Sequence, residues 1–151
     1  MSAPPGAEAR GVEVHAEHPD RHIEPAAVRT VVLAVCAGEN VVPVSVGVIL
    51  GDHALVRGLH REWMGLDTDT DVLSFVLDED AQAAGRLDGE VYVDLDTAWA
   101  RAPEFGTTPE REALRYVAHG VLHLAGHDDA TAEQRAGMRT LEDRYLDAAG
   151  V

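Results

Sequence analysis

The chain has no lysine, a single cysteine and no long run of hydrophobic residues. With one thiol, Cys36, it cannot form an internal disulfide bond. No apolar stretch approaches the roughly 20 residues that a membrane-spanning helix needs. The first residues also lack the basic and then apolar pattern of a secretion signal. These absences predict a soluble, cytoplasmic protein.

Basic residues are scarce relative to acidic ones. The chain carries 12 arginines against 27 acidic residues, and its formal net charge is −15. Indiscriminate nucleic-acid binding depends on a positive surface that neutralises phosphates, so this balance argues against it. A local patch of arginines stays compatible with the composition, because the planar guanidinium group binds phosphate well.

The 151 residues, of which 46% are hydrophobic, suffice for one ordinary core and are too few for two comfortable domains. We expect a flexible N-terminal tail over residues 1–20 and a single domain over residues 21–151. Alternating valines predict a strand, and Pro25 suits the first turn of a helix. The expected strands are 12–16, 42–50, 72–77 and 90–95. The expected helices include 25–37, 52–63 and 96–102. Two more helices are expected: the histidine segment described next, and a last helix that begins at a capping box of Thr131 and Gln134.

The segment from His119 to Asp129 gathers residue types that bind metal ions. His119 and His123 are four residues apart, so on a helix both imidazoles point to one side. Gly126 suits the end of that helix, because glycine adopts the left-handed conformation in which the chain reverses. Asp128 and Asp129 can then turn back toward the histidines. Two imidazoles and one carboxylate, with a position left for water, form a known catalytic zinc arrangement.

Two histidines at this spacing also occur on ordinary polar helix faces. Here the helix carries a broad apolar arc, which predicts a buried position. The arc consists of Leu114, Val117, Ala118, Val121, Leu122 and Ala125. Buried imidazoles need partners for their ring nitrogens, and a metal ion would supply them. The ligand types do not exclude iron, whereas a zinc protease is disfavoured because Gly120 stands where its motif has a glutamate base.

A second acidic group has the alternate spacing that begins a calcium loop, and it consists of Asp67, Asp69 and Asp71. Val72 stands where that loop needs glycine, and Asp78 stands where it needs a bidentate glutamate. We therefore favour a solvated turn before a strand.

Three segments together resemble the YbeY family of bacterial rRNA maturation factors and single-strand endoribonucleases. Residues 119–129 resemble the family's signature His-Gly-x-Leu-His-Leu-x-Gly-x-Asp-His. Residues 70–75 read Thr-Asp-Val-Leu-Ser-Phe, like the family's strand motif, and residues 89–91 resemble its Gly-Asp-Ile segment. Because the order and the separations of these segments also fit, the resemblance covers the chain from about residue 41 to its C-terminus.

The resemblance implies an α+β fold in which a small, mixed, four-stranded sheet packs with about five helices and the metal-bearing helix is central. It implies a cytoplasmic, metal-dependent endoribonuclease that is specific for single strands and acts in small-subunit rRNA processing and ribosome quality control. The implied partners are single-stranded RNA or rRNA and the ribosomal small subunit or its proteins.

The resemblance also implies one zinc ion, with another divalent metal as the alternative. Two of the family's three histidine ligands correspond to His119 and His123. The third corresponds to Asp129, whose oxygen can replace an imidazole nitrogen on zinc. His127 is the alternative third ligand.

The chain departs from the family pattern in the helix before the strand motif. Met64 occupies the position of an arginine to which the resemblance assigns phosphate binding or catalysis. Arg61, one turn earlier, is the candidate for substrate binding in its place. Arg111 and Arg115 precede His119 at four-residue intervals along the histidine helix. They could steer RNA toward the metal, or they could balance nearby acidic residues, and we favour the second interpretation. The acidic residues are Glu104, Glu110 and Glu112. No general base can be identified from the sequence.

A competing function is a non-catalytic ribosome assembly factor, with a structural zinc ion, that binds a ribosomal protein or a GTPase. The missing arginine at Met64 favours this alternative. The strong acidity of the chain also suits contact with basic ribosomal proteins. The nuclease is the leading prediction.

Overall fold

The computed structural model describes residues 11–66 and 70–151, which contain one mixed sheet in the strand order β1-β2-β4-β3. The strands are β1 (Val12–Ala16), β2 (Val42–Gly51), β3 (Val72–Val76) and β4 (Arg86–Asp94). β1, β2 and β4 run parallel, whereas β3 pairs with β4 in the antiparallel direction. The expected mixed sheet of four strands is confirmed. β3 is an edge strand, so one of its sides has no strand partner within the described ranges.

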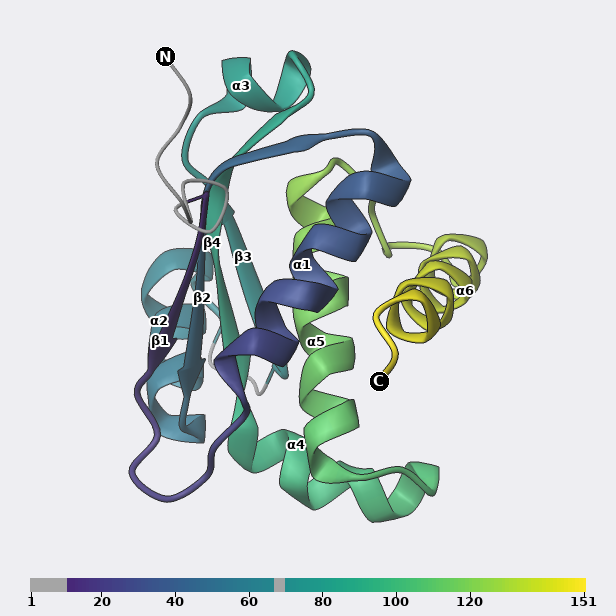
Figure 1. The fold of residues 1–151 in the computed structure, drawn as a ribbon. Coiled ribbons are helices and arrows are strands. Elements are labelled where there is room, and N and C mark those ends of the chain that lie inside the picture. The colour runs from purple at the N-terminus through teal and green to yellow at the C-terminus, as the bar shows by residue number, and fades with distance from the viewer. Residues whose placement is uncertain (1–10, 67–69) are drawn as a thin grey trace.

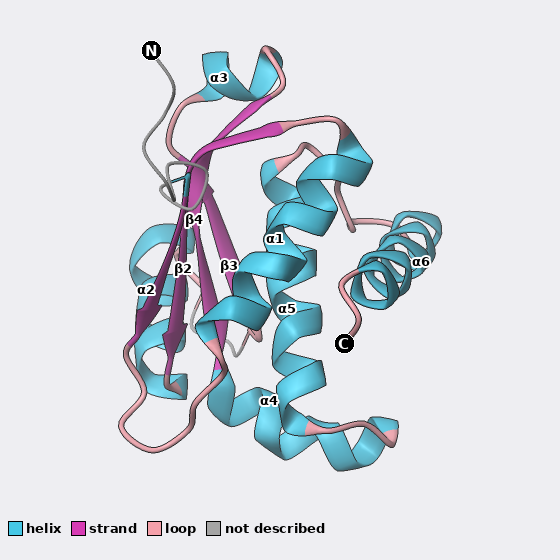
Figure 2. Cartoon of the chain, in the orientation of Figure 1, coloured by secondary structure: helices cyan, strands magenta, loops and turns pink. Residues whose placement is uncertain are grey.

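Helices cover both faces of this sheet in layers (Figure 1). The helices are α1 (Pro25–Glu39), α2 (His53–Met64), α3 (Glu79–Ala83), α4 (Leu95–Arg101), α5 (Pro109–Leu124) and α6 (Ala132–Ala148), with a 3-10 turn at Ala102–Phe105. α1 and α5 pack on one face, α2 lies on the other, and α6 packs against α1 and α5 from outside (Figure 2). The α+β fold is confirmed, with α3 as a short helix in addition to the five expected.

α5 is the central helix, as expected. It contacts β3 and β4 on one side and α1, α4 and α6 on the others. The predicted apolar arc of α5 is buried, apart from Ala125, which is partly buried against the core. The arc therefore anchors the helix that carries both histidines in the middle of the hydrophobic core.

Gly120 allows α5 to approach the sheet closely. A β-carbon at this position would lie 2.3 Å from Cγ1 of Val91 and 3.1 Å from Oγ of Ser74. The Ser74 hydroxyl donates a hydrogen bond to the carbonyl oxygen of Gly120 at 3.0 Å. A glutamate side chain, as in the zinc protease motif, does not fit between helix and sheet here.

The segment that joins β3 to β4 differs from the expectation. The structure has α3 there, and β4 begins at Arg86, four residues before the expected start at residue 90. Gly89 lies within β4, where a β-carbon would lie 2.5 Å from the carbonyl oxygen of Phe75. The glycine thus permits close strand packing and does not mark a turn, which explains why the strand was predicted too short.

β2 has the predicted extent, but its alternating valines are not uniformly buried. Val46 and Val48 lie in the core, whereas Val42 and Val44 are exposed because the first part of the strand extends beyond the helices. At the N-terminus, residues 12–16 form β1 as expected, so this part of the predicted tail over residues 1–20 belongs to the sheet. Residues 1–10 lie outside the described part. Within the described ranges, no helix is both long and apolar enough to cross a membrane.

Candidate metal centre

The local sequence determines where the histidine helix begins and how the chain leaves it. Thr108 caps α5 by accepting a hydrogen bond from the backbone N–H of Arg111. At the other end, Gly126 has a φ of 104°, a left-handed conformation that glycine adopts without strain. The chain then turns and enters α6 through the predicted capping box of Thr131 and Gln134. This turn brings Asp129 back over the last turn of α5.

His119, His123 and Asp129 converge on one point, with a ligand atom of each within 4.8 Å of those of the other two. The two Nε2 atoms of the histidines are 3.0 Å apart. Each of them lies 3.3 Å from an oxygen of Asp129, Oδ2 for His119 and Oδ1 for His123. All three side chains are partly exposed, so the site is open to a substrate.

These separations suit a tetrahedral metal ion. Ligand atoms placed about 2.0–2.1 Å from a tetrahedral zinc ion are roughly 3.3–3.4 Å apart. The donor set of two imidazole nitrogens and one carboxylate oxygen leaves one of the four positions for water or substrate. The residues present therefore fit a metal ion, and the geometry is that of an open site.

Glu142, on α6, orients His119 from the side away from the metal position. Its Oε2 lies 2.8 Å from Nδ1 of His119, and its Oε1 accepts a hydrogen bond of 3.2 Å from Arg115. Because the carboxylate accepts a hydrogen bond from the Nδ1–H group, Nε2 is left with its lone pair directed toward the candidate metal position. Burial lowers the pKa of His119, but the Glu142 hydrogen bond and the charges of Glu142, Asp129 and Asp71 outweigh burial and raise it.

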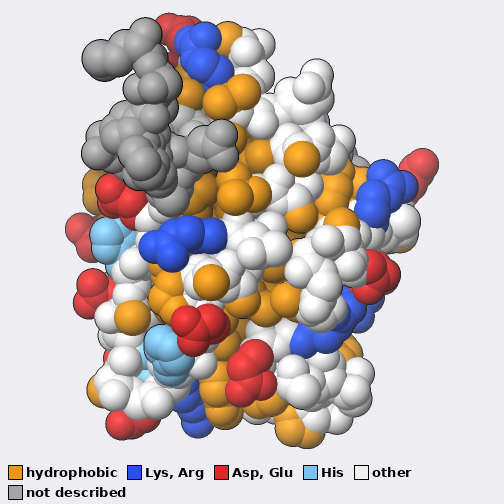
Figure 3. Space-filling view, in the orientation of Figure 1, with side chains coloured by type: hydrophobic (Ala, Val, Ile, Leu, Met, Phe, Trp, Pro, Cys, Tyr) orange, Lys and Arg blue, Asp and Glu red, His pale blue; other side chains and the backbone are white. Residues whose placement is uncertain are grey.

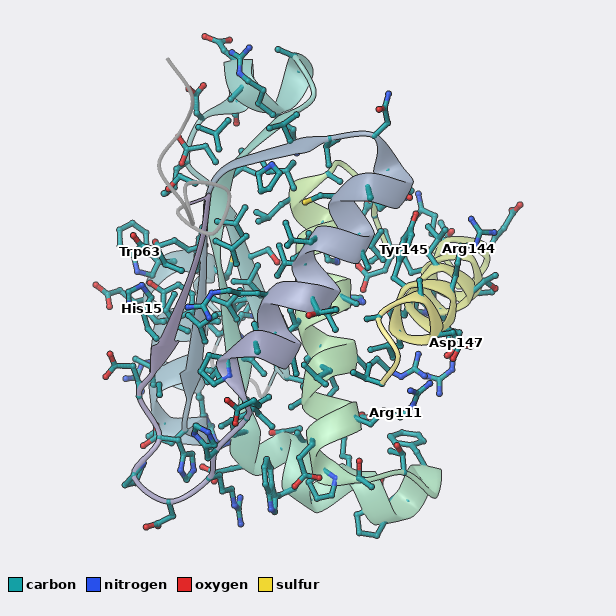
Figure 4. The ribbon with its side chains drawn as sticks, in the orientation of Figure 1. His15, Trp63, Arg111, Arg144, Tyr145 and Asp147 are labelled. Atoms are coloured by element: carbon teal, nitrogen blue, oxygen red, sulfur yellow. The ribbon has the colours of Figure 1, made fainter. Side chains whose placement is uncertain are left out.

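His127, the alternative third ligand, contacts a different group. Its Nε2 is hydrogen-bonded to Glu39 at the end of α1, and the same carboxylate accepts a hydrogen bond from the hydroxyl of Tyr145. Figure 4 shows Tyr145 on the side of α6 that faces α1. Within the described ranges, the group that could hold a metal contains Asp129 and not His127.

Two hollows lie on either side of the three candidate ligands and share Asp71, Val72, His119 and Asp129. We name the first, of about 260 Å³, the arginine hollow, because Arg101, Arg115, Arg135 and Arg139 line it. We name the second, of about 370 Å³, the Met64 hollow; Met64, Thr70, Leu73, Ser74, Val76 and His123 complete its lining.

Asp71 lies in a bend directly before β3, where a solvated turn was expected, and its side chain is partly exposed. It lines both hollows, and its carboxylate lies 3.4 Å from the guanidinium group of Arg101. Burial raises the pKa of Asp71, although the charges of His119 and Arg101 oppose this effect. Asp67 and Asp69, the other members of the predicted cluster, lie outside the described residues.

The arginines singled out in the sequence do not converge on one point as the candidate metal ligands do. Arg61 is exposed and lines a separate hollow on α2, whereas Met64 lines the hollow beside the metal ligands. Arg111 and Arg115 pair with acidic groups, as favoured, but of the expected partners only Glu112 is recorded near them, 4.0 Å from Arg115, and the main partners are on α6. Arg111 pairs with Asp147, and Figure 4 shows these two side chains extending toward each other. The substrate role of Arg61 stays a prediction.

Sequence reasoning missed Glu142, Asp71 as a site residue, and the two arginines of α6 in the arginine hollow. Glu142 and these arginines come from a helix whose sequence shows no metal or phosphate motif. A usable signal was the four-residue spacing of Arg135 and Arg139, which places them on one side of α6. Only the packing of α6 on α5 brings that side to His119.

Comparisons with known proteins agree with this geometry. The family model of endoribonuclease YbeY matches residues 13–150. The chain is 44% identical over 142 residues to the endoribonuclease YbeY of Salinibacter ruber, which covers 91% of this chain and 90% of the relative. It is 38% identical over 130 residues to that of Chlorobium phaeovibrioides, with 86% and 85% covered. A solution structure from Thermotoga maritima is similar at a TM-score of 0.61 and 28% identity, covering 91% of this chain and 88% of that one.

Proposed function

The chain belongs to the YbeY family of endoribonucleases, and from this premise we propose that it is a metal-dependent enzyme that cuts single-stranded rRNA. The observation that carries the proposal is the convergence of His119, His123 and Asp129 between two open hollows. A structural zinc ion is normally enclosed by four protein ligands. Three ligands beside two hollows suit a metal that meets a substrate.

We propose zinc as the metal, held by Nε2 of both histidines and by a carboxylate oxygen of Asp129. When bound, a divalent ion at this position supplies the Lewis acidity that activates water for attack on a phosphodiester and offsets charge on the phosphoryl oxygens. The protein supplies the orientation. Glu142 and Arg115 hold the ring of His119 so that its Nε2 faces the site.

We assign proton transfer to Asp71. Two carboxylates among the described residues line both hollows, Asp71 and Asp129. Asp129 is a candidate metal ligand, which leaves Asp71 for proton transfer. A raised pKa brings a carboxyl group closer to the neutral range in which a general base or acid works well. Its neighbour Arg101 keeps the carboxylate in position and can add positive charge near the substrate.

The biological setting that we propose follows the family. The substrate is rRNA of the small subunit, the activity serves rRNA maturation and ribosome quality control, and the partners are the small subunit or its proteins in the cytoplasm. The functional role of Arg61 in substrate binding belongs to this proposal as well.

The test is cleavage of a single-stranded fragment of small-subunit rRNA by untagged protein whose zinc content has been measured. We expect cleavage by the zinc-loaded protein, no cleavage after chelation, and recovery when zinc is returned. A His119→Ala, His123→Ala double variant should bind no stoichiometric metal and should not cleave. The same fragment annealed to its complement controls for strand preference and should be cut poorly.

The absence of cleavage by fully zinc-loaded, folded protein would reject the nuclease. It would leave binding within the ribosome assembly pathway as the function.

A further inference from the structure

Arginine side chains are concentrated on one side of the candidate metal centre. Four arginines line the arginine hollow, whereas the described lining of the Met64 hollow contains no arginine. A group of four arginines is not expected in a chain whose net charge is −15. On the face shown in Figure 3, basic side chains occur at separate places among acidic and apolar ones.

The arginines of the hollow are not equally committed to partners within the protein. Arg115 pairs with Glu142 at 3.2 Å and with Asp143 at 2.6 Å. Through Glu142 it helps to hold His119 in place. Arg101 is paired with Asp71 at 3.4 Å. These two guanidinium groups are therefore largely neutralised by neighbouring carboxylates.

Arg135 and Arg139 are held by contacts of another kind within the described part of the chain. The guanidinium group of Arg135 donates to the carbonyl oxygens of Ala130 at 3.2 Å and Asp129 at 3.4 Å. That of Arg139 lies over the ring of Phe105, 5.8 Å from its centroid. Neither makes an ion pair with a carboxylate anywhere in residues 11–66 and 70–151, and both are exposed.

The local charge balance leaves these two arginines free to bind an anion. Of the carboxylates that line the hollow, Glu112 and Glu142 are buried beside Arg115, Asp71 faces Arg101, and Asp129 faces the histidines. Guanidinium groups with exposed N–H donors match the oxygens of a phosphate in geometry as well as in charge.

Resting on the proposed function, we propose that Arg135 and Arg139 bind backbone phosphates of single-stranded RNA next to the phosphate at the metal ligands. The hollow is continuous with His119 and Asp129, so a strand with one phosphodiester at these ligands enters it with the neighbouring part of its backbone. The exposed ring of Phe105, held beneath Arg139, offers a surface on which the adjacent base can stack. The RNA therefore leaves the metal centre on the side of α6.

The test compares two double variants that change the net charge equally. Arg135→Gln with Arg139→Gln removes the free arginines of the hollow. The matched control, Arg86→Gln with Arg144→Gln, removes two exposed arginines outside both hollows. Binding of a fluorescent single-stranded rRNA fragment is measured on metal-free protein, so that nothing is cut, over a range of salt concentrations. Zinc affinity and thermal unfolding are measured for every variant.

Each phosphate contact to a single strand contributes about 0.7 to the slope of log K against log salt concentration. The hollow variant should therefore lose about 1.4 from this slope and bind about 25-fold more weakly at roughly 0.1 M salt. The control should change less than about 3-fold, and zinc affinity should stay at the wild-type value in both. Because Arg135 contacts the turn that carries Asp129, the single Arg139→Gln variant is measured as well and should lose about 0.7 from the slope.

In the zinc-loaded enzyme, the hollow variant should raise KM and leave kcat close to the wild-type value. Equal losses of RNA affinity in the two double variants would overturn the inference, because they would indicate a general charge effect. An unchanged salt slope in the hollow variant would overturn it too. If wild-type protein cleaves RNA and the hollow variant matches it, the proposed function stands and the inference fails. If wild-type protein binds RNA without cleaving it, the proposed function fails, and the salt slopes still decide the inference.

Discussion

The two hollows beside the candidate metal centre share four residues, yet they differ in charge and in origin. The arginine hollow is formed mainly by α5 and α6, which follow each other in the sequence, with Arg101 from the end of α4. The Met64 hollow is formed mainly by β3 and the end of α2, next to the strand motif. The comparison teaches that the candidate metal centre is open to two hollows, whereas the arginines that could bind a charged strand line only the first of them.

The unequal distribution of arginines between the two hollows also limits what can be concluded about function from the net charge of the chain. A net charge of −15 argues against a broad nucleic-acid surface, but it does not bear on two unpaired guanidinium groups beside a metal site. Electrostatic repulsion from the rest of the surface would disfavour RNA contacts elsewhere, so under our proposal Arg135 and Arg139 determine where the strand binds.

Removal of the metal should have the largest effect and should separate cleavage from binding. Chelation is expected to lower cleavage below detection, because the Lewis acid is lost. The affinity for single-stranded RNA and its dependence on salt concentration should change much less than cleavage does, since Arg135 and Arg139 remain in place. Parallel measurements of cleavage and of binding on metal-free protein check this. Loss of all RNA binding on chelation would show that the arginine hollow makes no independent contribution.

Asp71→Asn should affect catalysis next most strongly, because Asp71 belongs to both hollows. Loss of a general acid or base lowers kcat by about 10²- to 10⁴-fold, while zinc content should be unchanged and RNA affinity should not fall, because the change frees Arg101 from its carboxylate partner. Asp80→Asn, an exposed carboxylate in α3, is the matched control. Single-turnover cleavage rates give the comparison, and a wild-type rate in Asp71→Asn would remove this residue from the proposed mechanism.

Glu142→Ala should weaken zinc binding, because it frees the ring of His119 from its orienting hydrogen bond. Changes to such outer partners typically cost about 10- to 100-fold in metal affinity. Asp143→Ala is the matched control, since Asp143 also binds Arg115 and does not contact His119. Competition with a zinc chelator measures both affinities. Equal affinities in the two variants would mean that Glu142 only links α5 to α6.

Met64→Arg should make the two hollows more alike, with the smallest effect of this series. The new guanidinium group would add one phosphate contact on the side whose described lining lacks arginine, which raises the salt slope by about 0.7 and the RNA affinity about 5-fold at roughly 0.1 M salt. Leu77→Arg places the same charge at another exposed apolar position, outside both hollows. A gain of the same size in both variants would contradict the idea that this side of the metal centre meets RNA.

The sequence predicted the features that depend on local spacing. His119 and His123 on one face of α5, the left-handed Gly126 and the capping box that starts α6 are set within a few residues of each other. The convergence of Asp129 on the histidines follows from the same turn. These elements could be predicted because helix periodicity and glycine chemistry act over short distances.

The features that depend on packing could not be predicted. Glu142 reaches His119 only because α6 lies across α5, and the arginine hollow exists only because α4 ends beside the same surface. The roles of Gly120 and Gly89 likewise arise from close contacts between helix and sheet or between strands. In the sequence, Gly120 was informative only as the absence of a glutamate base, whereas the structure shows both glycines as points of close contact.

The most direct test of the account is a crystal structure of zinc-loaded protein with an anomalous difference map recorded at the zinc edge, together with the zinc-to-protein ratio. The account predicts one zinc ion per chain, about 2.0–2.2 Å from Nε2 of His119, Nε2 of His123 and one oxygen of Asp129. Its fourth position should face the two hollows. A zinc ion bound through His127 and not Asp129, or no stoichiometric zinc at the two histidines, would contradict the account.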